Sequence, residues 1–493
     1  MTNRSEELRE LLSWLSCDGT TAACFRPADL RKEPDSPEAA RIAELLEQPD
    51  ERVTDLVEAM QDLLEKNPRK VLGAAPAHLG ASATPANFNW LFEEARRHLE
   101  APALTLEVLK RNQPQGSSVG AELADFPGRD DTEIEITPRM RTFETLADAG
   151  AWAITAVQAA AFRVATSKPT LPPHTVSDTH FRYPLVTRNG EASVALFSDW
   201  GTGYYHSAYI AKHIAELGAQ QAVHLGDVYY TGGLAEFRER FDPWIDKYIL
   251  PRMPFFAMNA NHEMDSHGIA YFDHLRSKRA RGGQDGRPAQ PQEGSYFCLY
   301  NDHYQVIGID TAYWRNGRCP PGRDEGCDLM REWLETRLRE GRAAGRINIL
   351  LSQNEPWVER TTKLFEDLAF VLQPELVDLW FWGDQHFCAL YPPSNETPFV
   401  GSCIGHGGYP YSVKSRRWFG RHKVVPEWCE TAPRFHLRKD RGNNGFCLLE
   451  AAPDQLRLRY VDWRRNARCT VDIPVHEGRL DWAGRTKSVG SEV

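Results

Sequence analysis

The sequence predicts an α/β layered fold preceded by a helical domain, and three observations lead to this prediction. Residues 1–165 carry apolar residues at helical spacing but no motif with a chemical function. Residues 166–193 contain four prolines, which exclude a regular helix, so we expect a connector there. Across residues 194–475, short apolar runs typical of buried strands alternate with amphipathic helical patterns. Residues 476–493 are expected to be a tail.

The N-terminal helices are indicated by apolar stripes and by helix start signals. Residues 8–15 and 53–64 each place their apolar side chains on one helix face. Thr84-Pro85 and Thr137-Pro138 each resemble an N-cap followed by proline at the first helical position. The second pair would open a long helix through Trp152. We expect this domain to border the opening of the functional site.

The expected strands of residues 194–475 end in polar clusters. Five apolar runs lead directly into Asp199-Trp200-Gly201, Gly226-Asp227, Asn261-His262-Glu263, Gln353-Asn354-Glu355 and Gly383-Asp384-Gln385-His386. In α/β folds the carboxyl ends of the strands carry the functional groups. Carboxylates that converge there would repel one another and raise one another's pKa unless a cation lay among them. The sequence therefore predicts a site for hard metal ions.

The remaining segments of this part are expected to be simpler. Residues 445–450 and 455–461 read as the strands of hairpins, and residues 328–338 as an amphipathic helix. Residues 280–292 are rich in Gly, Arg, Gln and Pro, which is typical of a surface loop.

The composition narrows the class of protein. The 493 residues, 41% hydrophobic and 11% aromatic, suffice for two or three packed domains. No stretch reaches the ~20 apolar residues of a membrane-spanning helix, and the first residues lack the apolar core of a secretory signal. The ten cysteines form no C-x-x-C pair and are expected to be mostly buried thiols. We therefore expect a cytoplasmic protein without a membrane partner. Its net charge of -10 argues against sequence-independent binding of nucleic acids.

The ordered series of strand-end motifs resembles the calcineurin-like metallophosphoesterase superfamily. Within it, Asp199-x-Gly201 and Gly226-Asp227-x-x-Tyr230 resemble the purple acid phosphatase branch. The resemblance covers about residues 194–461 and leaves the N-terminal helices unexplained. It implies a four-layer α/β/β/α sandwich, in which two mixed sheets pack together and two metal ions lie at the strand ends.

For the first metal ion, the resemblance implies four ligands that are all present: Asp199, Asp227, Tyr230 and His386. A phenolate, two carboxylates and an imidazole form a hard, anionic set, which holds iron(III) in the family. The neighbouring Tyr229 is expected to be a packing residue.

The second metal ion would share Asp227 and take Asn261, and here the sequence departs from the family. Gln353 and Asp384 stand where the family has histidines. The set would then consist of oxygen donors only. Such donors favour manganese, magnesium or another hard divalent ion over zinc.

Alternatives remain open at this second position. Asn354 or Glu355 could replace Gln353 as the ligand if the register shifts. The second site could also be empty, which would leave a one-metal enzyme or an inactive fold.

Other polar residues are candidates for contact with a substrate. His262 resembles the family's histidine that supports the leaving group; the alternative is that it only fixes Glu263. Lower-ranked candidates for substrate contact are His406, His206, Arg416 and Arg417. The rival interpretations are a simple turn for His406 and a solvated loop for the two arginines. His224 is expected to be a buried strand residue.

The resemblance implies a metal-dependent phosphoesterase that hydrolyses a phosphate mono- or diester of a small molecule through metal-bound hydroxide. Two alternatives belong to other classes. A degenerate second site would suit a binding or regulatory module whose partner surface is the N-terminal domain. A one- or two-metal centre with a tyrosine ligand would also suit non-phosphate chemistry, including redox chemistry.

Overall fold

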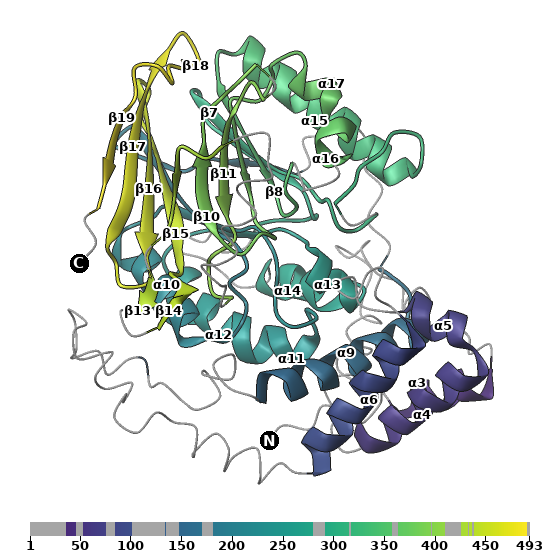
Figure 1. The fold of residues 1–493 in the computed structure, drawn as a ribbon. Helices are drawn as coiled ribbons and strands as arrows, with labels where there is room; N and C mark the ends of the chain where they lie inside the picture. Colours follow the sequence, from purple (N-terminus) through teal and green to yellow (C-terminus); the bar gives the residue numbers. More distant parts are fainter. Residues whose placement is uncertain are drawn as a thin grey trace.

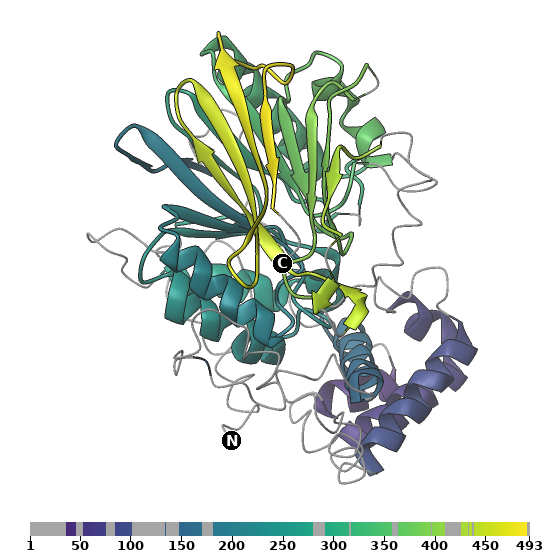
Figure 2. The ribbon, with the colours of Figure 1, turned by 60° about the vertical axis from the view of Figure 1, so that its left-hand side comes forward.

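The computed structural model describes residues 36–45, 53–74, 84–100, 134, 147–169, 181–279, 291–314, 317–356, 363–395, 397–409, 425–431, 433–435 and 438–490. In these residues two β-sheets pack face to face, and helices cover the outer face of each sheet (Figure 1). The predicted α/β/β/α sandwich is thereby confirmed. Figure 2 shows the yellow strands of one sheet beside the green strands of the other.

One sheet has nine strands and holds the first three strand-end motifs. Its order is β18 (Arg479–Leu480), β17 (Ala467–His476), β16 (Gln455–Asp462), β15 (Gly445–Ala451), β3 (Glu191–Phe197), β4 (Gln221–His224) and β5 (Phe255–Ala257), with β19 (Thr486–Val489) on β17 and β2 (Thr187–Arg188) on β3. The strands β3, β4 and β5 are parallel, and Phe197 pairs with His224, which pairs with Ala257. Their carboxyl ends therefore lie side by side.

The other sheet has eight strands and holds the last two motifs. Its order is β1 (Arg182–Pro184), β6 (Phe297–Tyr300), β7 (Tyr304–Gly308), β8 (Ile347–Ser352), β9 (Leu379–Trp382), β11 (Val400–Ile404), β10 (Cys388–Tyr391) and β12 (Trp428–Cys429). The neighbours β8 and β9 are parallel, with Ser352 opposite Trp382. A separate two-stranded ribbon is formed by β13 (Pro433–Phe435) and β14 (Arg438–Gly442).

Side-chain alternation along the strands explains the layers. Val194 and Leu196 of β3 face the core between the sheets, where Ile349 and Leu351 of β8 meet them. The alternate residues face the outer helices, as Phe197 does. Because parallel strands between two layers are buried on both faces, they read as continuous apolar runs in the sequence.

Helices of two groups cover the sheets. Against the nine-stranded sheet lie α10 (Tyr205–Glu216), α11 (Leu234–Glu236), η3 (Phe237–Phe241), α12 (Asp242–Trp244), η4 (Ile245–Ile249), α13 (Asn261–Asp265) and α14 (Ile269–Arg279). Against the eight-stranded sheet lie α15 (Glu325–Ala343), α16 (Lys363–Asp367) and α17 (Ala369–Leu372). Asp324 caps α15 by accepting from the backbone N–H of Gly326 at 3.0 Å.

The N-terminal helices share a core of their own. They are α3 (Pro37–Leu45), α4 (Val53–Lys66), α5 (Pro68–Gly73), α6 (Pro85–Glu100) and α9 (Ala147–Ala165). The predicted cap at Thr84 is present, since its hydroxyl accepts from the backbone N–H of Asn87 at 3.3 Å. The expected start signal at Thr137-Pro138 and the stripe of residues 8–15 lie outside the described residues. In the described part of the chain, no helix has both the length and the apolar character needed to cross a membrane.

The cysteines match the sequence prediction in part. Five of them are buried thiols: Cys298, Cys388, Cys403, Cys447 and Cys469. Cys319 and Cys327, however, form a disulfide that ties the loop before α15 to the first turn of that helix. Their separation of eight residues does not predict the bond, because the bond depends on the fold of this segment.

Candidate metal centre

Tight turns after β3 and β4 bring two carboxylates together. Asp199 and Asp227 both have left-handed backbone conformations, with φ of 56° and 75°, which aspartate tolerates better than most residues. The backbone N–H of Asp199 donates to the carbonyl of Gly226 at 3.0 Å. Gly226 itself has φ of 110°, and a Cβ there would lie 2.6 Å from Ala260. The glycine before Asp227 is thus required by both conformation and space.

Asp199, Asp227 and His386 form the first cluster of possible metal ligands. One donor atom from each lies within 4.8 Å of the others. The distance from Asp199 Oδ1 to His386 Nε2 is 3.2 Å. These three side chains come from the ends of β3, β4 and β9, as the sequence predicts.

A tyrosine completes this cluster, but it is Tyr229 and not Tyr230. The Tyr229 hydroxyl donates to Asp199 Oδ1 at 2.7 Å. It also lies 3.0 Å from Asp227 Oδ2 and 2.8 Å from His386 Nε2. The prediction that Tyr229 only packs and that Tyr230 faces the ligands is therefore contradicted.

The local backbone explains this difference. Val228 forms an isolated parallel bridge with Gly201, and the chain then turns at Tyr229 and Tyr230. The Tyr229 N–H donates to the Gly201 carbonyl at 2.9 Å, which keeps Tyr229 beside the turn after β3 that carries Asp199. Tyr230 faces the other way, and its ring lies 5.1 Å from the guanidinium of Arg240.

The predicted second set of donors lies beside the first. Gln353 packs against Gly226. A Cβ atom added to this glycine would lie 2.9 Å from Gln353 Cγ. The Gln353 amide donates to Asp384 Oδ1 at 3.3 Å, and the Asp384 N–H donates to Asp199 Oδ2 at 3.0 Å. Asn261 opens α13, next to Ala260, which contacts the same glycine. The strand ends thus form one continuous cluster.

Oxygen atoms of this second set, and one of the neighbouring Glu355, are buried without a hydrogen-bond partner among the described residues. They are Asp227 Oδ1, Asn261 Oδ1, Gln353 Oε1 and Glu355 Oε2. Unpaired buried oxygens are costly, and folded proteins almost always satisfy them. A divalent cation bound among them would satisfy all four. The residues present therefore fit a hard metal ion.

The charges of the cluster support the same conclusion. Burial raises the pKa of Asp227 well above its usual range, and the nearby Asp199, Glu263 and Asp384 raise it further. Burial likewise raises the pKa of Glu263 to about 8. Burial acts in the same direction on Asp199, but its contacts with His386, Tyr229 and Ser198 outweigh it and lower that pKa. Without cations, Asp227 and Glu263 would have to hold protons instead.

His262 lies at the edge of the first cluster. Its Nδ1 is 2.6 Å from the carbonyl oxygen of Tyr230, which can only accept, so Nδ1 carries the proton. Its Nε2 lies 4.0 Å from Asp227 Oδ2, and its ring centroid lies 4.4 Å from that of Tyr229. The position is suited to a group that donates or accepts a proton beside the ligands.

Two of the lower-ranked candidates for substrate contact, His206 and His406, are buried in the interior. His206 is fully buried, stacks on Trp463 at 3.9 Å and contacts Asn444. His406 is also buried, and burial lowers its pKa to about 4. Both therefore belong to the interior, which does not support contact with a substrate. Arg416 and Arg417 lie outside the described residues.

Sequence reasoning missed Tyr409, which covers the first cluster. Its ring stacks on His386 at 4.2 Å and lies 4.7 Å from the Tyr229 ring. Its N–H donates to the carbonyl of Asp199 at 3.0 Å. The glycine-rich turn at 405–408 was the available signal, because it allows this segment to approach β3 closely; we expected the turn to deliver His406 instead.

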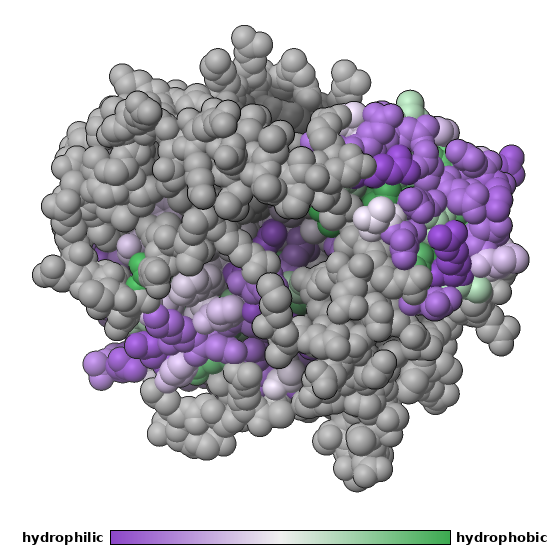
Figure 3. All heavy atoms as spheres, turned by 90° about the horizontal axis from the view of Figure 1, so that it is seen from below, coloured by the Kyte–Doolittle hydropathy of each residue, from purple (hydrophilic) through white to green (hydrophobic). Residues whose placement is uncertain are grey.

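The N-terminal helices touch the element that carries Asn261 and His262. Arg163 of α9 lies 3.9 Å from the buried carboxylate of Asp265 on α13. The hydroxyl of Thr166 is 3.0 Å from Nδ1 of His267. Seen from below, the N-terminal helices at the right of Figure 3 present a mostly hydrophilic surface.

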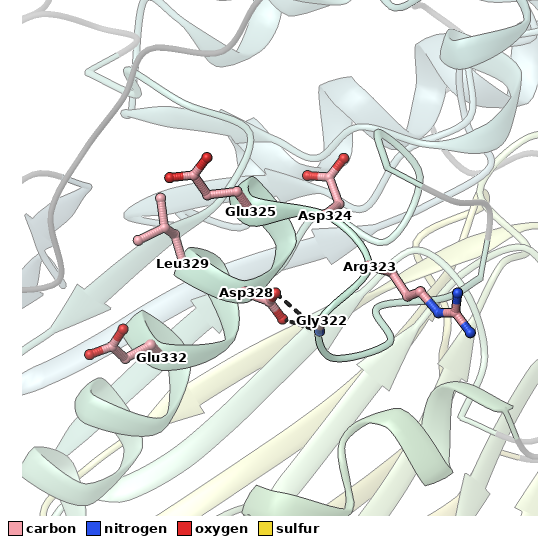
Figure 4. A pocket seen from close by; sticks show the side chains of 7 residues that line it. All are labelled: Gly322, Arg323, Asp324, Glu325, Asp328, Leu329 and Glu332. Atoms are coloured by element: carbon pink, nitrogen blue, oxygen red, sulfur yellow. Dashed lines mark hydrogen bonds between the residues drawn. The ribbon is translucent and has the colours of Figure 1, made fainter.

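A second acidic region lies away from these ligands, at the start of α15. It is a shallow pocket lined by Gly322, Arg323, Asp324, Glu325, Asp328, Leu329 and Glu332 (Figure 4). Asp328 accepts from the N–H of Gly322 at 2.8 Å, and Asp324 caps the helix. These contacts explain two of the acids as structural.

Comparison with known proteins gives a family match and distant structural similarities. Residues 176–388 match the family described as calcineurin-like phosphoesterase. No curated protein matches the sequence. Among solved structures, GAP50, the anchor in the inner membrane complex of Plasmodium, is 15% identical, with 57% of this chain and 88% of that chain covered and a TM-score of 0.40.

Two further solved structures resemble the chain at a similar or greater distance. Purple acid phosphatase PPD1 from yellow lupin (Lupinus luteus) seeds is 15% identical, with 62% of this chain and 56% of that chain covered and a TM-score of 0.38. Vps29 from Entamoeba histolytica, as a single mutant, is 11% identical, with 61% of this chain and 99% of that chain covered and a TM-score of 0.22.

Proposed function

We propose that the chain, which matches the calcineurin-like phosphoesterase family over residues 176–388, hydrolyses a phosphate ester of a small molecule with two metal ions. One observation carries this proposal. The ends of five strands bring together the first cluster, defined above, and four buried oxygens without hydrogen-bond partners. Bound cations would satisfy both the charges and the unpaired oxygens of this arrangement.

The ligand sets would divide between two positions. Asp199, Tyr229 and His386 would hold the first ion, and Asn261, Gln353 and Asp384 would hold the second. Asp227 has one oxygen at the first cluster and an unpaired oxygen for the second, so it would bridge them. Two carboxylates, an imidazole and a phenol suit iron(III) at the first position, whereas oxygen donors suit manganese or magnesium at the second.

When bound, the two ions would supply the positive charge that acidifies a water molecule and stabilises the phosphoryl group. The protein's own residues would do the rest. Tyr229 and Ser198 orient the Asp199 carboxylate by hydrogen bonds. The Tyr230 carbonyl fixes the His262 tautomer, so that Nε2 faces the site and can exchange a proton with the leaving group. Tyr409 limits water access above His386.

The proposal is tested by measuring the hydrolysis of p-nitrophenyl phosphate and of bis(p-nitrophenyl) phosphate by the purified chain. We expect activity with at least one of them, loss of activity on chelation, and recovery with iron and manganese. The Asp227→Asn variant should lower kcat by about 100-fold or more, since it alters a ligand of both ions. The matched control Glu332→Gln, in the surface pocket of Figure 4, should leave kcat unchanged. A metal-loaded parent without activity on either ester would refute the proposal.

The alternative of a binding or regulatory module is favoured by one observation. Gln353 and Asp384 replace two histidines of the family, which would weaken the second position. The same assay decides between the two functions, because a module would bind metal without turning over either ester.

A further inference from the structure

The segment after β8 carries Glu355, a residue that the proposed ligand sets leave unused. Ser352 ends β8, and its hydroxyl donates to the carbonyl of Asn354 at 2.7 Å. The Asn354 side chain turns away from the metal centre, because its oxygen accepts from the Thr311 hydroxyl at 2.7 Å and from the Gly317 N–H at 3.2 Å. Its two neighbours, Gln353 and Glu355, face the other way.

Both neighbours meet Asp384, which ends the adjacent strand β9. The Gln353 amide donates to Asp384 Oδ1 at 3.3 Å. The carboxyl group of Glu355 lies beside that of Asp384, and burial, together with this neighbour, raises the pKa of Glu355 well above its usual range. Glu355 is 7% exposed, and its Oε2 atom has no hydrogen-bond partner in the described part of the chain. Asp384 therefore lies between an amide and a second carboxyl group.

The surroundings of this carboxyl pair contain few positive charges. Five acids lie in the metal centre: Asp199, Asp227, Glu263, Glu355 and Asp384. Among the described residues, these acids form ion pairs only with two histidines, His386 and His262, and with no lysine or arginine. Two buried carboxyl groups in contact need either a shared proton or a cation to be stable.

We propose that Glu355 is a ligand of the second metal ion and forms with Asp384 a carboxylate pair at that position. The inference rests on the proposed function only for the presence of the metal centre. It makes the second position richer in negative charge than Gln353 and Asp384 alone would. A site with two carboxylates besides the shared Asp227 should prefer manganese or magnesium to zinc.

The rival explanation is a proton shared by Glu355 and Asp384. A single substitution separates the two, because glutamine resembles a protonated glutamate in shape and hydrogen bonding but lacks its charge. If the pair shares a proton, Glu355→Gln leaves metal binding unchanged. If Glu355 is a ligand, the same substitution weakens the binding of manganese at the second position by about 100-fold or more. Even the substitution of a residue that only hydrogen-bonds to a ligand lowers metal affinity about 10–100-fold.

The experiment titrates manganese into the chelator-treated full chain, with the first position filled by iron, and follows free manganese by electron paramagnetic resonance. We expect the parent to bind one manganese ion tightly and Glu355→Gln to lose that affinity. The matched control Glu325→Gln with Glu332→Gln removes two acids of the surface pocket (Figure 4) and should not change it. The Glu355→His variant should recover binding and shift the preference towards zinc, because imidazole is a softer donor.

A second measurement covers the case in which Glu355→Gln fails to fold. In crystals of the parent soaked with manganese, the anomalous signal should lie within about 2.0–2.6 Å of a Glu355 carboxylate oxygen. Unchanged manganese affinity in Glu355→Gln, or an anomalous peak far from Glu355, would overturn the inference while leaving the phosphoesterase proposal intact. A parent that binds the ion through Glu355 but hydrolyses neither ester would refute the proposed function and support the ligand.

Discussion

At the scale of single residues, the metal centre depends on which of two adjacent tyrosines faces the ligands. Spacing from Asp227 points to Tyr230, whereas the backbone contacts of Val228 and Tyr229 with Gly201 hold Tyr229 beside Asp199. Burial and the neighbouring Asp199 and Asp227 raise the pKa of Tyr229 well above its usual range. A bound cation would reverse this effect, since it stabilises the phenolate.

The first prediction compares the two tyrosines. Tyr229→Phe removes a hydroxyl that lies within 3.0 Å of one possible metal-ligand atom in each of Asp199, Asp227 and His386. The iron(III)-loaded parent should absorb visible light through phenolate-to-iron charge transfer, and Tyr229→Phe should lose this band and lower kcat by about tenfold or more. Absorption spectra of the iron-loaded proteins are the measurement. Tyr230→Phe is the control, and loss of the band in that variant instead would restore the original assignment.

Some residues of the metal centre could be predicted from the sequence and others could not. Asp199, Asp227 and His386 could be predicted because each follows an apolar run, and parallel strands end at one edge. Tyr229 could not be chosen, because a spacing rule counts residues and does not say which side of the backbone they occupy. Tyr409 was missed because it reaches the cluster through contact between remote segments.

At the scale of elements, the strands were the most predictable part of the fold. β3, β4, β5, β8 and β9 are largely buried on both faces, and each appears in the sequence as a short, mainly apolar run. The order of strands in each sheet was not predictable, because pairing depends on long-range contacts that leave no local pattern. The disulfide before α15 was missed for the same reason.

The second prediction concerns β4 and its last residue, His224. This side chain is buried among the rings of Phe197, Phe241 and Trp200, and burial lowers its pKa to about 3. The unfolded chain would bind a proton near pH 6.5, so the unfolded state gains protons first as the pH falls. His224 therefore destabilises the fold progressively from about pH 6.5 down to about pH 3.

Replacing His224 by leucine should remove this part of the pH dependence. Between pH 7.5 and pH 5.5, the free energy of unfolding of the parent should fall by about 1 kcal/mol more than that of His224→Leu. Urea unfolding at the two pH values measures the difference. His476→Leu, at a side chain that is 70% exposed, is the control. Equal falls in the parent and in His224→Leu would mean that the histidine is accessible to protons in the folded state.

At the scale of the whole molecule, the N-terminal helices and the sandwich meet beside the metal centre. The helices α3–α6 and α9 have a core of their own, while Trp152 of α9 also contacts the core of the sandwich. Beyond it, α9 ends at α13, the short helix that begins with Asn261 and His262. The position of His262 is therefore coupled to α9 through contacts of Arg163 and Thr166 with residues 265–267.

The third prediction is that this contact influences turnover more than metal binding. Removing residues 1–165 should change the ratio of kcat/KM for the monoester and the diester by about tenfold or more, because a 1 Å displacement of a catalytic group can cost that much. Metal content, measured by mass spectrometry, should stay the same, since most ligands follow the strands of the sandwich. In the full chain, Arg163→Gln with Thr166→Val should reproduce part of the effect.

The control for this prediction lies in the same helices but away from α13. Lys66→Gln breaks an exposed ion pair with Glu38 inside the helical group, and exposed pairs contribute little to stability. It should leave both kinetic parameters and metal content unchanged. If the truncated protein treats both esters as the parent does, the helices have no part in catalysis. If truncation instead removes the metal ions, α9 supports the ligands themselves, through the position of Asn261 at the start of α13.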